Sequence, residues 1–494
     1  MTDINAGTVM PEIEKLGIPA EMIGNPRPAS IEAKRTSFLA PSENSEYVGG
    51  DTIRFSLPMS QNHYLTPDVS FEFDWKNTSD DDAKQGALDY SASAIIQRIR
   101  IFHGSNLLSD VSEYGRLRQI INDVSQSPVN SSTLSNVLEG TPQSAQQLGK
   151  KGAGGSTAIS SLSAIPRQQR SEFINRNATR RYKVALVDGL IGTLATASLP
   201  CHAMTAAPLR VEIELATTNN CVLSVPARVA NDGAAGVTAA MPITWKVSKA
   251  QLNATFVQVS SSAQALIDQA CGGKYMLNTS MYRHSQQNIN GDSTQVSILL
   301  PYAFSSLKHV VHGLYVQTNE NDQTKYTISG RSKCHVEHQW YQIGASRVPS
   351  QYINGEAELL SETCKCFAVS SDLLQVCNHL DTDNISVELT EGWYSAGTTP
   401  VSTADKVSST NKRGTFAFGF DLECWGAKSS AQRIENGINS TSISMYLNLE
   451  TSTGNVFGKV NSTDAAAAKQ IECHSWAQYD CLITCMNGTA YARF

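Results

Sequence analysis

The sequence has little charge. Asp, Glu, Lys and Arg make up 17% of its 494 residues, and the formal net charge is −6. Tight, sequence-independent binding to nucleic acid requires a basic face that displaces counterions, so this composition argues against such binding by the surface as a whole. Low charge together with many Ser, Thr, Asn and Gln residues favours β-rich structure with polar loops over a helical bundle.

Long apolar runs are also missing. The most apolar window, 184–200, contains Asp188, two glycines and several hydroxyl side chains, so we expect no membrane-spanning segment. Residues 1–24 lack a basic stretch followed by an apolar run, and we therefore expect no secretory signal. The eleven cysteines are an odd number without the spacing of a disulfide framework. Mostly reduced thiols are predicted, with Cys473, Cys481 and Cys485 as small buried apolar side chains.

Recognisable catalytic and cofactor motifs are absent. There is no Gly-x-Ser-x-Gly sequence, and the ten histidines are scattered. In GKKGAGGST, residues 149–157, both lysines precede most of the glycines, which does not match a phosphate-binding loop. The acidic run 80–82 lacks the alternation of a calcium loop and is predicted to be a loop tip. We predict no catalytic residue, no cofactor site and no enzymatic activity.

Two short motifs are candidates for metal ligation. Residues 334–338, CHVEH, and Cys364-x-Cys366 contain ligand types. On a strand Cys334 and His338 share a face but His335 does not, and no second pair has zinc-finger spacing, so no metal site is predicted. His309 and His312 are expected on opposite faces of one strand.

The charges are unevenly distributed in one window. Eight basic residues surround the single acid Glu172; they are Lys150, Lys151, Arg167, Arg170, Arg176, Arg180, Arg181 and Lys183. A local basic patch and solvated loop charges both fit this pattern, and the second is favoured.

The most informative stretch is 91–124. Ile99 and Ile101 alternate with arginines, as in a strand with one buried face. Residues 103–106 form a turn, 107–111 a short strand, and Tyr114, Leu117, Ile121 and Val124 recur at helical spacing. The stretch is typical of a β-sandwich with a helix on a connection.

Similar patterns extend over both halves of the chain. In the first half strands are predicted near 53–57, 69–75, 95–102, 107–111, 182–187, 209–216, 221–225 and 243–247. In the second half strands are predicted from 252, and near 274–283, 294–300, 310–318, 334–343, 385–389, 416–425, 443–449, 479–486 and 489–494. Helices are expected after Ser260 and over 355–367. These elements predict two tandem eight-stranded jelly-roll β-sandwiches with short helices in the connections.

The predicted organisation has three parts. Residues 1–45 contain five prolines between short apolar pieces and are expected to form an extended arm that lies on another surface. The first jelly roll is predicted over 46–247 and the second over 248–494.

Several stretches, in this order, resemble the double jelly-roll major capsid proteins of small DNA viruses of eukaryotes. The resemblance is closest to those of polinton-like viruses and more distant to those of virophages and adenoviruses. In the first half the stretches are IIQRIRIFHGSNLLSDVSEYGRL, RRYKVALVDGLIGTL and LRVEIELA. In the second they are KYMLNTSMYRHSQQNINGDSTQVSILLPYAFSSLKHVVHGLYV, QWYQIGASRVPSQYI, FAFGFDLECW, NGINSTSISMYLNLE and AQYDCLITCMNG.

This resemblance implies a structural protein of a virion. Two jelly rolls would stand side by side, and three copies would form a pseudo-hexagonal capsomer of an icosahedral shell. The loops 125–181 and 390–413 would supply outward towers and trimer contacts, and the arm would join neighbouring capsomers. Penton and minor capsid proteins are the other implied partners, and an underlying membrane remains open. The family has no catalytic residues to carry over.

Two alternatives remain at this point. A glycan-binding β-sandwich surface protein fits the fold class but conflicts with the missing signal and the many cysteines. A β-sandwich hydrolase would need a convergent nucleophile and base or paired acids, which the sequence does not display.

Overall fold

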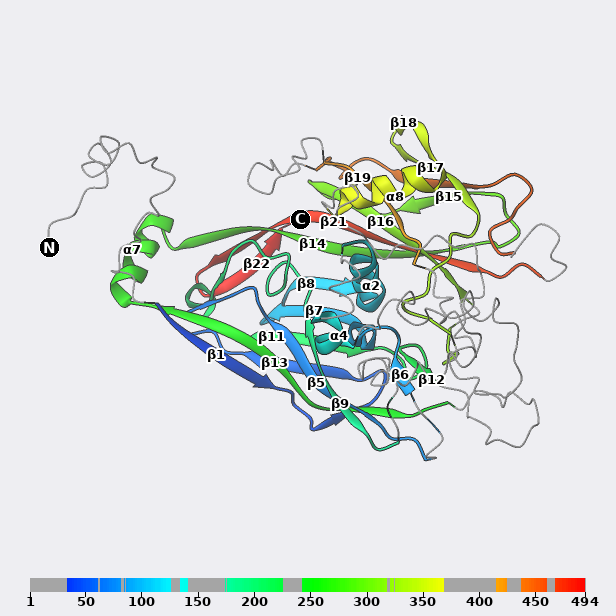
Figure 1. Cartoon of the computed structure of the whole chain (residues 1–494). Helices are drawn as coiled ribbons and strands as arrows, with labels where there is room; N and C mark the ends of the chain where they lie inside the picture. Colours follow the sequence, from blue (N-terminus) through cyan, green and yellow to red (C-terminus); the bar gives the residue numbers. More distant parts are fainter. Residues whose placement is uncertain are drawn as a thin grey trace, which may run out of the picture.

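The computed structural model shows two antiparallel β-sandwiches lying side by side, with short helices on their connections (Figure 1). It describes residues 33–60, 63–80, 84, 86–125, 134–140, 174, 176–224, 242–317, 320–323, 325–367, 415–423, 437–459 and 467–493. The predicted all-β class with two sandwiches is confirmed. The strand predicted at 385–389 and the loop 390–413 lie outside the described residues.

The first sandwich is built from β1 to β13. Its larger sheet has the order β10-β4-β13-β5-β9, with β1 and β2 also paired to β13, and its smaller sheet has the order β3-β11-β7-β8. β12 and β6 form a separate pair. The strands are β1 Ala33–Pro41, β2 Glu46–Tyr47, β3 Thr52–Leu57, β4 His63–Leu65, β5 Ser70–Asn77, β6 Gly86–Leu88, β7 Ile96–His103, β8 Asn106–Ser112, β9 Thr179–Ala185, β10 Leu199–Pro200, β11 Leu209–Leu215, β12 Val222–Ser224 and β13 Trp245–Val259. All eight predicted strand regions are present, and β1, β2, β4, β6 and β10 are additional.

The second sandwich contains β14 to β22. One sheet has the order β14-β21-β16-β19, with β22 paired to β21, and the other has the order β15-β20-β17-β18. The strands are β14 Lys274–Ile289, β15 Gln295–Leu300, β16 Leu307–Val316, β17 Val336–Ile343, β18 Ser346–Asn354, β19 Phe418–Asp421, β20 Met445–Thr451, β21 Ile471–Met486 and β22 Thr489–Arg493. The helices are α2 Tyr114–Ser125, α4 Leu134–Glu139, α7 Ser261–Cys271 and α8 Gly355–Cys366, with short 3₁₀ turns η2 Ala92–Ile95 and η4 Cys201–Met204.

The stretch 91–124 folds as its pattern predicts. β7 and β8 form a hairpin whose turn contains Gly104 with φ +58°, a conformation that glycine adopts without steric cost. The chain then enters α2, whose Tyr114, Leu117 and Val124 are buried. Ile121 packs against the core while remaining partly exposed. This unit places α2 between the two sandwiches (Figure 1).

The alternation of apolar and polar residues along β11 also explains which side chains are buried at the centre of the smaller sheet. The apolar residues of β11 are buried, and its Ile213 lies opposite Ile53 of β3 and Ile99 of β7. On the other face Glu212 is buried as well, because three arginines surround its carboxylate at 3.2–3.3 Å. Those arginines are Arg54, Arg100 and Arg210.

The predicted division between 247 and 248 falls inside one continuous strand. β13 runs to Val259, and every strand paired with it belongs to the first sandwich. The register shifts between Ser248 and Gln251, where Lys249 has φ +48°. This irregularity interrupts the alternation in the sequence, which is why the pattern predicts two strands where the structure has β13. The strand pairing therefore extends the first sandwich to Val259, and α7 connects it to β14.

The predicted arm is also shorter than 1–45. Residues Ala33–Pro41 form β1, which pairs along its length with β13 of the same chain. They therefore belong to the first sandwich of the same chain. Residues 1–32 lie outside the described part of the chain.

Both predicted helices of the second half are present. In α7 the Ser260 hydroxyl accepts a hydrogen bond from the amide of Ala263, and Gly272 ends the helix with φ +62°. α8 begins at Gly355 as predicted. Among the described helices, none has the length and apolarity needed to cross a membrane.

Candidate functional site: the interface between the two sandwiches

The side chains with metal-binding potential do not converge. In the described part of the chain, no three His, Cys, Asp or Glu side chains are grouped as metal ligands. His335 Nε2 lies 2.8 Å from the carbonyl oxygen of Lys459, whereas His338 lies beside Glu450. Cys364 and Cys366 are buried in α8. These residues have separate structural partners.

The two histidines of β16 contact different elements. His312 is fully buried, 2.7 Å from Ser475 Oγ and 2.8 Å from the Tyr341 hydroxyl of β17. His309 lies 3.2 Å from the Tyr282 hydroxyl and packs against Phe367, which follows α8. Burial lowers the pKa of His312 to about 3, so its ring is neutral at physiological pH.

The predicted cysteine environment is confirmed in the described residues. Their nine cysteines are free thiols, and Cys473, Cys481 and Cys485 are buried. Burial raises the pKa of these three thiols to about 12. They stay protonated at neutral pH and act as small apolar side chains.

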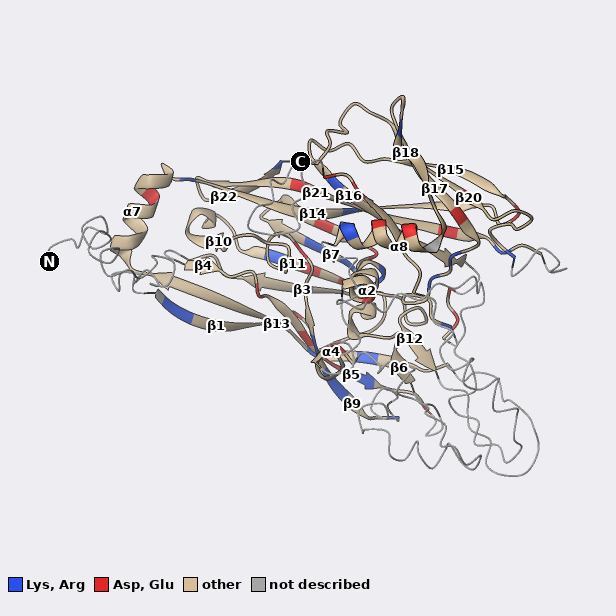
Figure 2. Cartoon of the chain, turned by 45° about the horizontal axis from the view of Figure 1, so that its top comes forward, with Lys and Arg blue, Asp and Glu red and all other residues tan. Residues whose placement is uncertain are grey.

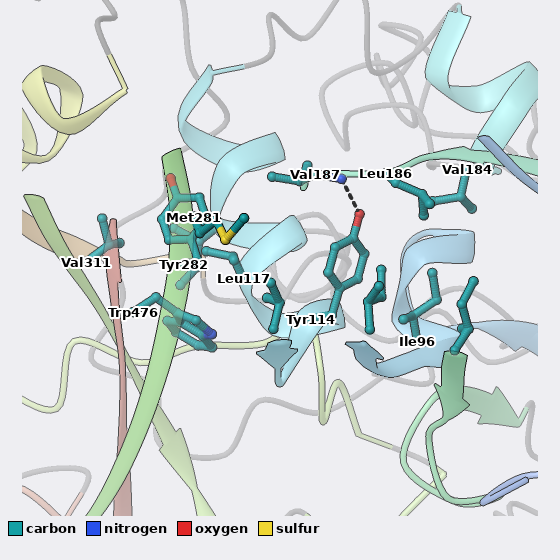
Figure 3. Close-up of a cluster of buried hydrophobic side chains, with 14 of the residues drawn as sticks. Ile96, Tyr114, Leu117, Val184, Leu186, Val187, Met281, Tyr282, Val311 and Trp476 are labelled. Carbon is teal, nitrogen blue, oxygen red and sulfur yellow. Dashed lines mark hydrogen bonds between the residues drawn. The ribbon is translucent and has the colours of Figure 1, made fainter. Parts of the chain in front are cut away.

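A continuous apolar cluster joins the two sandwiches. Tyr114 and Leu117 of α2 lie near Met281 of β14 and Trp476 of β21 (Figure 3). The Tyr114 hydroxyl accepts a hydrogen bond of 2.8 Å from the amide of Val187, and the Trp476 indole donates to the carbonyl of Ser112 at 3.3 Å. The first bond positions α2 within the first sandwich, and the second joins β21 of the second sandwich to β8 of the first.

A buried cluster of charges surrounds Arg116 on α2. Its guanidinium lies 3.0 Å from Glu320, 3.6 Å from Glu113 and 3.8 Å from Glu472, and it donates to a ring nitrogen of His474. Its side chain is 4% exposed. Burial raises the pKa of Glu113 and of Glu472. Glu320, Glu472 and His474 belong to the second sandwich, so the cluster is an ionic connection between the two.

His284 extends this cluster within the second sandwich. It stacks on His474, with Nε2 and Nδ1 3.0 Å apart. Burial, assisted by the positive charge of Arg116, lowers the pKa of His284 to about 3. Burial lowers the pKa of His474 as well, so both rings are neutral and serve as hydrogen-bonding groups at this interface.

A second ionic connection is centred on Arg331, which is completely buried. It forms an ion pair with Asp123 of α2 and donates to the carbonyls of Phe416 at 3.0 Å, Thr415 at 2.9 Å and Ser329 at 3.3 Å. Its donors thus join α2 of the first sandwich to two connecting segments of the second. A buried guanidinium needs this complete set of acceptors.

Asp89, also fully buried, holds the loop that carries Arg331. One of its carboxylate oxygens accepts the amide of Ile328 at 2.7 Å and the amide of Ser329 at 3.1 Å. Asp89 follows β6 in the first sandwich. The connections centred on Arg116 and on Arg331 therefore both cross from one sandwich to the other.

Sequence reasoning did not identify these charged residues. Arg116, Ile120 and Asp123 recur at helical spacing, and all three side chains are buried. The signal available in the sequence was a charged residue on the apolar stripe of a helix. Such a residue must find a buried partner, so it indicates a buried ion pair.

Part of the predicted basic window is neutralised. On β9, Arg181 pairs with Asp74 at 3.0 Å and with Glu72 at 3.2 Å, and Lys183 pairs with Glu72 at 3.0 Å. Figure 2 shows the basic stretch of β9 next to β5, which carries both acids. The hydrogen bonds of Glu72 outweigh its burial and hold the pKa of its carboxyl at about 2. Lys150, Lys151, Arg167 and Arg170 lie outside the described residues.

No protein-family model and no curated protein matches this chain. Solved structures do match. PBCV-1 VP54, fitted into a cryo-EM reconstruction of the virophage Sputnik, aligns over 96% of this chain and 99% of its own, with 11% identity and a TM-score of 0.54. A PBCV-1 virus capsid model aligns over 96% and 99%, with 11% identity and a TM-score of 0.53. The Sputnik virophage structure aligns over 96% and 91%, with 11% identity and a TM-score of 0.56.

The chain has the double jelly-roll fold. The alignments span nearly the whole of each chain, so the likeness includes both sandwiches. The fold that the sequence resemblance implied is thereby confirmed. In this double jelly roll, the Arg116 and Arg331 clusters and the apolar cluster hold the two rolls together as one unit.

Proposed function

We propose that the protein is the structural major capsid protein of an icosahedral virus and forms homotrimeric, pseudo-hexagonal capsomers. The observation that carries the proposal is the full-length likeness to PBCV-1 VP54, to a PBCV-1 virus capsid and to the Sputnik virophage. A chain that shared only a sandwich module with capsid proteins would match over part of its length. The proposed location is the capsid shell of the virion.

The interface between the rolls supports this role physically. Three copies of a two-roll unit place six sandwiches around an axis, which gives a nearly hexagonal outline. Such an outline is kept only if the two rolls of each copy do not move relative to each other. The Arg116 and Arg331 clusters and the shared apolar core provide this rigidity.

The proposed partners are further copies of the chain, together with penton and minor capsid proteins. We propose no enzymatic activity, no cofactor and no specific nucleic-acid binding. The function consists of assembly through complementary surfaces, which is stabilised by buried apolar area.

Electron microscopy of the purified full chain tests this proposal. We expect particles with a six-sided outline and a central threefold axis, and hexagonal arrays or closed shells at higher concentration. Isolated elongated particles with two sandwiches each, at every concentration, would contradict the proposal. Specific binding on a glycan array by such single copies would favour the glycan-binding alternative.

Deletion of residues 1–32 should separate assembly from folding. Because β1 begins at Ala33, this deletion leaves every described strand in place, and we expect the capsomer to persist while shell formation weakens. Deletion of residues 1–41 also removes β1 from β13 and should lower the unfolding midpoint. Equal unfolding midpoints for the two deletions, measured by circular dichroism, would refute this division of roles.

A further inference from the structure

A buried lysine of the second roll lies close to two carboxylates. The side chain of Lys308 on β16 is 4% exposed, and its ammonium nitrogen lies 2.9 Å from Oδ1 of Asp480 on β21. Oε1 of Glu423, which follows β19, lies 3.9 Å from the same nitrogen, and the Glu423 side chain is 1% exposed. Lysine is almost never fully buried unless it is paired. An amine, a carboxyl group and a second carboxylate are thus brought together away from water.

A bulge in β16 aims the lysine at the carboxyl group. β16 and β21 are adjacent antiparallel strands of one sheet (Figure 1). Leu307 lies opposite Tyr479 of β21. His309 lies opposite the adjacent residue, Gln478, so Lys308 is an extra residue of β16 at this point. Such a bulge changes the direction of a side chain relative to the regular alternation of the strand.

The segment that carries Glu423 is fixed to the same part of β16. The amide of Leu422 donates a hydrogen bond of 2.7 Å to the carbonyl of Lys308. Asp421, at the end of β19, lies opposite His309 in the strand register. The two carboxylates and the amine have side chains that are at most 12% exposed. The backbone therefore holds the three groups in a site with little access for water.

Two serine hydroxyls hold the Asp480 carboxyl group. Ser306 Oγ donates to its Oδ2 at 2.7 Å, and Ser280 Oγ donates to its Oδ1 at 3.3 Å. The Lys308 ammonium donates to Ser280 Oγ at 2.9 Å. Preorganised donors of this kind stabilise the negative charge that develops on carboxyl oxygens when a nucleophile adds to the carbon between them.

We propose that Lys308 and Asp480 condense to an intramolecular amide, with Glu423 as the proton carrier. The Lys308 ammonium gives one proton to Glu423, and the neutral amine attacks the carboxyl carbon of Asp480. Glu423 returns the proton to one carboxyl oxygen. That oxygen takes a second proton from the nitrogen and leaves as water. A C–N bond replaces a C–O bond, nothing is oxidised or reduced, and Glu423 ends in its starting state.

The arrangement of the groups favours this condensation. In water an amine and a carboxylate are ionised and hydrated, which opposes their reaction. Groups held in contact and in the correct orientation react as if their concentration were about 10⁵–10⁸ M. A closed site also keeps out the water that would hydrolyse the product.

The amide would join two neighbouring strands of the second roll covalently. Like a disulfide, it would restrict the unfolded chain, because Lys308 and Asp480 are far apart in the sequence. Unlike a disulfide, it needs no oxidant. The inference goes beyond the proposed function and is independent of it, so either can fail without the other.

Mass spectrometry of the denatured full chain tests the inference directly. We expect a mass that is lower than the sequence requires by the mass of one water molecule. After digestion with trypsin, residues 284–325, uncut at Lys308, should be joined to residues 470–493 in one branched peptide. The full calculated mass with cleavage at Lys308 would show an ion pair only and would overturn the inference. A loss of water without the branched peptide would do the same.

Three variants test the role of each group. Lys308→Arg keeps the positive charge but removes the nucleophilic amine, and we expect no loss of water. Glu423→Gln keeps the size of the side chain but removes the proton carrier, and should reduce the cross-linked fraction at least about tenfold. Lys246→Arg is the matched control, because Lys246 pairs with Glu46 at 3.0 Å on the surface, and it should keep the cross-link. Water loss in Lys308→Arg, or equal cross-linking in Glu423→Gln and the control, would contradict the inference.

Discussion

Replacing Arg331 with Met is expected to lower the free energy of unfolding by about 3–5 kcal/mol. The reason is that Asp123, which is 1% exposed, would lose the guanidinium that neutralises its buried carboxylate. The carbonyls of Ser329, Thr415 and Phe416 would lose their guanidinium donor as well. Urea denaturation of the purified variant, followed by tryptophan fluorescence, measures the change.

Two further variants make this result specific. Arg35→Met removes an arginine that pairs with Asp68 at the surface, where the side chains are 72% and 49% exposed, and should cost less than about 1 kcal/mol. The double variant Arg331→Met, Asp123→Leu removes both buried charges and should recover part of the loss. If Arg331→Met is as stable as Arg35→Met, the buried ion pair does not hold the two rolls together.

Acidification should destabilise the protein through His312, and His312→Gln should remove that contribution. The pKa of His312 is about 3 in the folded protein and about 6.5 in the unfolded chain. A lowered histidine pKa means that the folded state favours the neutral ring. Its stabilising effect is complete above pH 6.5 and is lost as the pH falls toward 3.

The expected loss is roughly 2–3 kcal/mol between about pH 6.5 and about pH 4.5. The free energy of unfolding of both proteins is compared near pH 7 and near pH 4.5. Other titrating groups are common to both proteins and cancel in the difference. Glutamine retains a hydrogen-bonding side chain for Ser475 and Tyr341 but does not titrate. Equal losses in the two proteins would show that His312 is protonated without cost in the folded state.

The sequence predicts the strands along which apolar and polar residues alternate regularly. It predicts fewer of the strands that lack this alternation. β7 and β11 were identified because apolar and polar side chains alternate along them. β2, β4, β6 and β10 have only two or three residues, too few for a period to appear. β1 reads AKRTSFLAP and is exposed at most positions, and only Phe38 and Ala40 contribute to the core, so no regular alternation marks this strand in the sequence.

The interface residues were less accessible to sequence reasoning for a different physical reason. Arg116 and Glu320 are separated by more than two hundred residues, and their pairing depends on how the rolls pack. Helical spacing placed Tyr114 and Leu117 toward a core but gave no information about which side chains of the other half meet them. Long-range charge pairing is a property of the packed fold and not of local periodicity.

The native mass of the full chain, measured by light scattering coupled to size exclusion, tests the central claim most directly. One copy has a mass of 53.4 kDa. A capsomer protein should elute as a species of three times that mass, and the mass should not change on dilution. A stable monomer over the whole concentration range would contradict the account, although the double jelly-roll fold itself would stand.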